Sequence, residues 1–104
     1  MASTKLASLR QLLKQMEDDL GFSEMSETQR DVLYAIRLVA DAQGRATISE
    51  IRGHMLAKTI SRPSFFRALS ALVDRKLIVH DGVGRTGTYL LAGSDRDLTV
   101  ADNA

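Results

Sequence analysis

Few residues in the chain have the types and the spacing that a catalytic or metal site requires. Glu50 and His54 stand four residues apart, which would place two possible metal ligands on one face of a helix. No third ligand is apparent, because His80 belongs to a different predicted element and the chain has no cysteine. The sequence also shows no phosphate-binding glycine loop with its lysine, and no nucleophile beside an evident base. We therefore predict a protein that is not an enzyme and uses no metal or cofactor.

The positive charge of the chain is concentrated in its middle. Residues 45–92 contain eight Lys or Arg and three Asp or Glu, an excess of +5, whereas residues 1–44 and 93–104 each carry −2. A cationic middle between acidic ends favours a face that meets a polyanion, because the local field steers association. The competing interpretation is an ordinary solvated surface.

The elements that position these charges are expected to form one domain. With 104 residues, of which 44% are hydrophobic, the chain can bury one core but not two. No run of about eighteen apolar residues could cross a membrane, and no apolar leader follows residues 1–5. We therefore expect no membrane association and a cytoplasmic location.

An amphipathic helix is predicted for residues 4–20, a segment without glycine or proline. Its apolar residues are spaced by three and four, as in a heptad repeat, and Leu12 widens the stripe. Gly21 is expected to end the helix as its C′ residue. The stripe must pack on its own domain or on the same helix of a second chain, and the pattern leaves both open. The candidate dimerisation residues are Leu6, Leu9, Leu13, Met16 and Leu20.

Two further helices of similar length are predicted from their N-terminal signals. Ser26 and Gln29 form a capping box before a helical pattern that extends to Gly44. Ser61 is a suitable N-cap for a helix that continues to about Arg75. The apolar faces are formed by Val32, Leu33, Ile36, Val39 and Ala40 in the first helix and by Phe65, Leu69, Leu72 and Val73 in the second.

Between these two helices, Thr47 and Glu50 form another capping box. It predicts a short helix that extends through Ile51 to Met55. Ile48 is interpreted as a short stub of strand at the start of this segment.

After the last predicted helix, the apolar residues no longer recur at helical spacing. Residues 77–80 and 88–91 are expected to be the two strands of a hairpin, and residues 81–87 its glycine-rich loop. The tail is polar and is expected to fray. The predicted organisation is an N-terminal helix at 1–22, a folded unit at 23–92 and a tail at 93–104.

The segment 61–72, with the sequence SRPSFFRALSAL, resembles the recognition helix of bacterial winged-helix repressors of the GntR family. The residues that follow, 74–78, resemble the end of that helix and the start of the first wing strand. The whole chain, with an apolar helix before this unit, is similar to a shortened MarR-type regulator. The resemblance implies a mostly α fold with a small β-hairpin wing (α+β), a winged helix-turn-helix with an extra N-terminal helix. It also implies a nucleoid-associated homodimer that binds double-stranded DNA and regulates transcription.

In a helix-turn-helix, the first turns of the recognition helix enter the major groove, and the wing reaches the adjacent backbone or minor groove. Arg62 or Arg67 would bind guanine through paired hydrogen bonds, and Ala68 would lie near a thymine methyl group. Arg85, between glycines, would enter the minor groove. The expected DNA-binding residues are Ser61, Arg62, Ser64, Arg67, Ala68, Arg85 and Thr86. Weaker phosphate contacts are expected from Thr47, Ser49, Arg52 and Lys58, with Arg45, Arg75 and Lys76 as further candidates.

Two other functions fit the same pattern. A winged helix can serve as a protein-interaction module, with the N-terminal helix as the partner-binding element. A phage or plasmid protein that binds DNA for replication or partition would use the same contacts as a repressor. The sequence leaves open the operator, a small-molecule effector, and whether transcription is activated or repressed.

Overall fold

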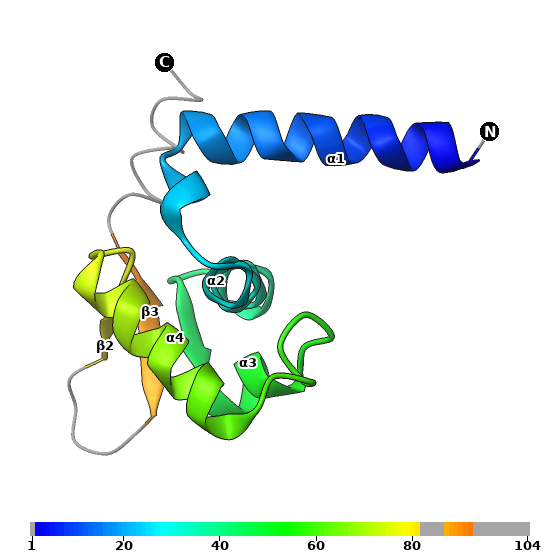
Figure 1. Ribbon diagram of the computed structural model, residues 1–104. Helices are drawn as coiled ribbons and strands as arrows, with labels where there is room; N and C mark the ends of the chain where they lie inside the picture. Colours follow the sequence, from blue (N-terminus) through cyan, green and yellow to red (C-terminus); the bar gives the residue numbers. More distant parts are fainter. Residues whose placement is uncertain (1, 82–86, 93–104) are drawn as a thin grey trace.

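The computed structural model describes residues 2–81 and 87–92, which form a mostly helical fold with a small antiparallel sheet (Figure 1). The arrangement confirms the expected α+β composition. In chain order the elements are α1 (Ala2–Asp19), the 3-10 helix η1 (Phe22–Glu24), α2 (Glu27–Val39), β1 (Arg45–Thr47), α3 (Ile48–Gly53), α4 (Arg62–Asp74), β2 (Ile78–His80) and β3 (Thr88–Leu91).

The sheet contains the expected hairpin and one more strand. Its order is β1-β3-β2, and β3 pairs antiparallel with both neighbours. Arg45 lies opposite Leu90 in one pairing, and Ile78 lies opposite Leu91 in the other. The prediction of a strand stub at Ile48 is wrong, because the Thr47 capping box already begins α3 there. The strand is formed by the three residues before it.

Helix α2 ends earlier than the apolar pattern suggests. The expected end was Gly44, but Val39 is the last helical residue and Ala40 is extended. Oδ1 of Asp41 accepts hydrogen bonds from the backbone N–H groups of Gln43 (2.9 Å) and Arg45 (3.0 Å), and these hydrogen bonds stabilise a turn instead of another helical turn. Gly44 closes the turn with a φ of 83°, in the left-handed region that glycine adopts without strain.

Helix α3 also ends before the expected Met55. The N–H of Leu56 donates to Nδ1 of His54 over 3.1 Å, which stabilises a turn directly after Gly53. Met55 is 74% exposed and therefore adds nothing to the core.

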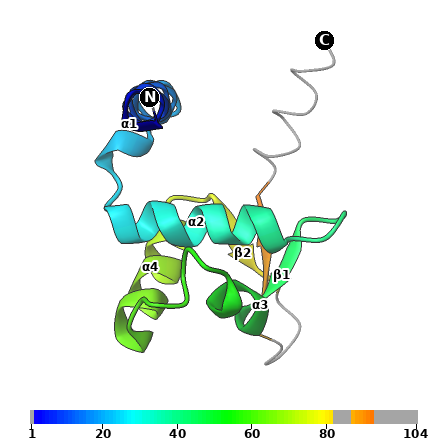
Figure 2. The same cartoon turned by 90° about the vertical axis from the view of Figure 1, so that its right-hand side faces the viewer.

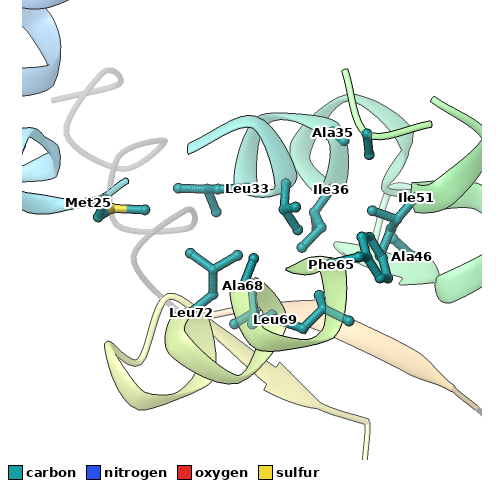
Figure 3. Close-up of a cluster of buried hydrophobic side chains, with 13 residues drawn as sticks. Met25, Leu33, Ala35, Ile36, Ala46, Ile51, Phe65, Ala68, Leu69 and Leu72 are labelled. Atoms are coloured by element: carbon teal, nitrogen blue, oxygen red, sulfur yellow. The ribbon is translucent and has the colours of Figure 1, made fainter. Parts of the chain in front are cut away.

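The hydrophobic core lies between α2 and α4 and is closed by α3 and the sheet (Figure 3). Val73 was expected on the apolar face of α4 but is 36% exposed, because it lies to one side of the stripe that packs against α2. The buried residues are Met25, Val32, Leu33, Ala35, Ile36, Ala46, Ile51, Ala57, Phe65, Ala68, Leu69, Leu72 and Ile78.

Helix α1 lies outside this core. Figure 2 shows it end-on, above the N-terminal half of α2. Gly21 follows it with a φ of 79°, as expected for a C′ residue. No helix in the described part of the chain is long and apolar enough to cross a membrane.

Candidate nucleic-acid interface

The N-terminus of α4 is held by a cap that the sequence predicted. Oγ of Ser61 accepts a hydrogen bond from the N–H of Ser64 over 3.3 Å. Pro63 stands in the first turn, where its missing N–H removes no helical hydrogen bond. The start of α4 therefore has a fixed direction, and the side chains on its first turns project from a rigid element.

The two arginines of α4 are exposed and are both held by neighbouring side chains. Nη2 of Arg67 donates to Oγ of Ser64, one turn earlier, over 3.3 Å. The guanidinium carbon of Arg62 lies 5.2 Å from the centre of the Phe66 ring, within cation–π distance. Both charges therefore stand on the outer side of α4, with their side chains partly ordered before any ligand arrives.

The structure does not support one expected base contact. Ala68 is 3% exposed and belongs to the core, because it lies three residues after Phe65 and four before Leu72 on the buried stripe (Figure 3). The prediction that its methyl group meets a thymine is therefore wrong. Of the five candidates on α4 or at its N-cap, Ser61, Arg62, Ser64 and Arg67 remain accessible.

The outer face of α4 and the start of α2 line an open groove of about 790 Å³. Several residues of this groove were not predicted from the sequence. Ser70 could have been predicted, because it lies three residues after Arg67 on the same face of the helix. Thr28 and Gln29 come from α2 and are brought beside α4 only by the fold. The groove is lined by Ser26, Thr28, Gln29, Pro63, Ser64, Phe66, Arg67, Ala68, Ser70, Ala71 and Asp74.

Phe65 and Phe66 have separate places. Phe65 is fully buried in the core, and its ring meets that of Phe66 edge to face at 5.2 Å. Phe66 is half-buried and lines the groove. Its ring therefore forms an apolar patch between two arginines.

The weaker phosphate candidates have different surroundings. Ser49 and Lys58 are exposed, whereas Oγ1 of Thr47 already accepts the N–H of Glu50 in the capping box. The guanidinium carbon of Arg52 lies 4.9 Å from the centre of the Phe65 ring, and its Nη1 atom is buried without a hydrogen-bond partner. Arg52 therefore supports the core at least as much as it offers charge to solvent.

The other basic candidates are partly engaged. Arg45 forms an ion pair with Asp81 (3.2 Å), which joins the start of β1 to the end of β2. Nη2 of Arg75 donates to the backbone oxygen of Glu24 over 3.4 Å. Lys76 is exposed at a φ of 66°, where the chain turns from α4 towards β2. The expected wing contacts Arg85 and Thr86 lie outside the described residues.

The pair of possible metal ligands has structural roles. Oε1 of Glu50 accepts the N–H of Thr47 over 2.9 Å, and Nδ1 of His54 accepts the N–H of Leu56. Within residues 2–81 and 87–92, no three Asp, Glu, His or Cys side chains gather as a metal site would require.

None of the residues of α1, all of which are described, is buried. The large apolar residues of the stripe are between 42% and 65% exposed: Leu6, Leu9, Leu12, Leu13 and Met16 in α1, and Leu20 directly after it. The helix is held to α2 by polar contacts. The hydroxyl of Tyr34 donates to Oε2 of Glu17 over 2.5 Å, and Nε of Arg30 lies 3.6 Å from the same oxygen. The described residues therefore leave the predicted dimerisation stripe exposed.

No protein family, curated protein or solved structure was found to match the chain.

Proposed function

We propose that the chain is a winged helix-turn-helix protein that binds double-stranded DNA and regulates transcription. In this proposal α4 is the recognition helix, α3 is the helix that precedes it, and the segment between β2 and β3 is the wing. A cytoplasmic, nucleoid-associated location and a homodimer formed through α1 belong to the same proposal. A small-molecule effector is not part of it.

The observation that carries the proposal is the outer face of α4. Two exposed arginines, Arg62 and Arg67, stand on the first two turns of a capped helix, each held by a neighbouring side chain. A guanidinium presented in this way matches the paired acceptors of guanine and the oxygens of phosphate. Ser61 and Ser64 add hydroxyl groups at the same end. The element order and the resemblance of residues 61–72 to recognition helices support the same function.

A protein-interaction module is the second candidate, and the exposed apolar stripe of α1 favours it. Winged helices serve both purposes, and a fold does not decide between them. A role in phage or plasmid replication or partition would use the same DNA contacts.

The test is binding to random-sequence duplex DNA, measured by fluorescence anisotropy at 50 and 200 mM salt. A dimer that neutralises about six phosphates is expected to lose affinity on the order of a thousandfold between these salts. Arg67→Ala should weaken binding, whereas Lys14→Ala removes a positive charge from the exposed surface of α1 and serves as the control. Absence of binding at the lower salt would contradict the proposal and favour the interaction module.

On a sequence-specific DNA site, Arg67→Ala also distinguishes a phosphate contact of Arg67 from a base contact. If Arg67 contacts a phosphate, its loss should weaken all sequences alike and reduce the salt slope. If it reads a base, discrimination at one position should fall by about 1–3 kcal/mol. Arg62→Ala answers the same question for the first turn of α4.

A further inference from the structure

The apolar stripe of α1, which ends with Leu20 directly after the helix, is exposed in the part of the chain that the structure describes. Each of its six large apolar side chains is at least 42% exposed, and none belongs to the core cluster. Figure 1 shows the N-terminal half of α1 extending past α2. Glu17, which holds α1 to α2, lies beside the stripe, four residues after Leu13 and three before Leu20. The contact with α2 therefore occupies one edge of the stripe near its C-terminal end and leaves Leu6, Leu9 and Leu12 exposed.

The charges of α1 are distributed unevenly along its length. The N-terminal and central parts carry Lys5, Arg10 and Lys14, whereas the C-terminal end carries Glu17, Asp18 and Asp19. Two such helices side by side in the same direction would bring like charges together. If the two helices ran in opposite directions, the basic end of each helix would meet the acidic end of the other.

The heptad positions make this comparison specific. With Leu6 and Leu13 at a and Leu9 and Met16 at d, the g positions are occupied by Lys5, Leu12 and Asp19, and Arg10 stands at e. In a parallel pair, g faces the e residue five positions later in the other copy. Lys5 would then face Arg10 on both sides of the interface, and Leu12 would face Glu17. A parallel pair therefore has repulsion between Lys5 and Arg10, and it places the Glu17 carboxylate against the apolar side chain of Leu12.

In an antiparallel pair, g faces g. With Leu6 opposite Met16 and Leu9 opposite Leu13, Lys5 lies beside Asp19 of the second copy on both sides. Leu12 then lies beside Leu12 of the second copy at the two-fold axis. Leu12, which widens the apolar stripe of α1, thus gains an apolar partner. The e positions face each other as well, so Arg10 lies beside Arg10 of the second copy. This single repulsion is set against two Lys5–Asp19 attractions, whereas the parallel pair has two Lys5–Arg10 repulsions. The balance of charge and the apolar contact therefore both favour the antiparallel arrangement.

We propose that α1 pairs antiparallel with α1 of a second copy, with Leu6 opposite Met16 and Lys5 opposite Asp19. The inference rests on the dimer in the proposed function and is independent of DNA binding. The resulting interface is isologous, because the same residues contribute from both copies. It relates the two α4 helices by a two-fold axis that crosses α1 at its middle, which calls for a palindromic DNA site.

The outer face of α2 offers additional area to this pair. Leu38 is 66% exposed and stands one turn after Tyr34, on the side of α2 that contacts α1. Paired helices lie about 8–10 Å apart, so a second α1 beside the first would also cross α2. This contact matters because α1 has little more than two heptads, too few for a stable isolated pair.

The absence of cysteine from the chain allows a direct test by disulfide formation. In the antiparallel register, Leu12→Cys should cross-link to itself under mild oxidation, because the two copies meet there. Leu6→Cys should not, since its two copies would be about 15 Å apart along the axis at 1.5 Å per residue. A mixture of Leu6→Cys and Met16→Cys proteins should give the mixed dimer. Self-cross-linking of Leu6→Cys would overturn the antiparallel arrangement.

Charge reversal tests the same arrangement without oxidation. Lys5→Glu would place two acidic pairs at the antiparallel interface and should raise the dimer dissociation constant by on the order of tenfold in low salt. Adding Asp19→Lys to the Lys5→Glu chain should restore the dissociation constant of the parent. In a parallel pair, Lys5→Glu would instead relieve the repulsion from Arg10 and tighten the dimer. The dissociation constants are measured by sedimentation of the full chain.

These measurements use the protein without DNA, so the dimer and the proposed DNA binding can fail separately. Because α1 contributes nothing to the core, the variants should keep the circular dichroism of the parent, and this spectrum is the control for folding. A monomeric mass at all concentrations tested, together with no cross-linking at residue 12, would overturn the pairing. In that case the stripe would be a binding surface for a different protein.

Discussion

The guanidinium of Arg67 donates a hydrogen bond to the hydroxyl of Ser64, one turn earlier on α4. Ser64 is therefore both part of the candidate interface and the group that orients its central charge. A long side chain held in one direction loses less conformational entropy when it binds. The contribution of Ser64 to binding should accordingly depend on Arg67.

Ser64→Ala removes the acceptor of this hydrogen bond and leaves the N-cap intact, since the cap uses the backbone N–H of Ser64. We expect DNA affinity to fall by roughly three- to tenfold, which corresponds to one hydrogen bond. In the Arg67→Ala background, the same substitution should have almost no effect. The four affinities are measured by anisotropy in one buffer. Additive losses would show that Ser64 contacts DNA by itself.

The neighbouring phenylalanines should differ clearly in their effects on stability. Phe65 is fully buried, whereas Phe66 is half-buried and lines the groove. We expect Phe65→Ala to lower the free energy of unfolding by about 3–5 kcal/mol. Phe66→Ala should cost about half as much or less, because solvent already reaches the ring. Urea unfolding of the two variants gives the comparison, and equal losses would contradict the assignment of Phe66 to the surface.

Asp41 connects the end of α2 to β1 and should make the stability of the fold dependent on pH. Backbone hydrogen bonds from Arg45 and Gln43 lower the pKa of this carboxyl below its usual 3.8. A lowered pKa in the folded state means that the ionised form stabilises the fold. This contribution is present at neutral pH, above the unfolded pKa, and is lost as the pH falls through the folded pKa.

The test compares the parent with Asp41→Asn by urea unfolding at neutral pH and near pH 3. The parent should lose more stability on acidification than the variant, which has no carboxyl at this position. Burial and the nearby Glu27 raise the pKa of Asp31, so that group acts in the opposite direction. It is present in both proteins and cancels in the comparison. An identical acid dependence in the two proteins would refute the role of Asp41.

Features set by a few neighbouring residues could be predicted from the sequence. The capping boxes at Ser26 and Thr47 and the N-cap at Ser61 depend on residues three positions apart, and all three are present. Strand β1 was missed because its three residues become a strand only by pairing with β3, more than forty positions later. The burial of Ala68 was predictable in principle, since helical periodicity places it with Phe65.

The residues of the candidate interface were also predictable only in part. Arg62 and Arg67 follow from the pattern of residues 61–72, and both are exposed on α4. The groove beside them depends on the packing of α2 against α4, for which the sequence carries no local signal. The behaviour of α1 was left open by its pattern, because an apolar stripe does not specify its partner. In the described part of the chain the stripe is exposed, so the core formed by α2, α3, α4 and the sheet does not cover it.

The contact between Tyr34 and Glu17 should control how firmly α1 is held on α2. Burial and the hydrogen bond to the Glu17 carboxylate raise the pKa of the Tyr34 phenol, so the donor stays protonated throughout the neutral range. Tyr34→Phe removes the hydroxyl and keeps the ring. We expect amide hydrogen exchange in α1 to accelerate severalfold, while the buried turns of α2 keep their protection. Thr28→Val, which removes a hydroxyl from α2 outside this contact, is the control. If α1 exchanged at the parental rate in Tyr34→Phe, this hydrogen bond would not hold α1, and its position would depend on the Arg30–Glu17 ion pair or on contact of the apolar stripe with a second copy.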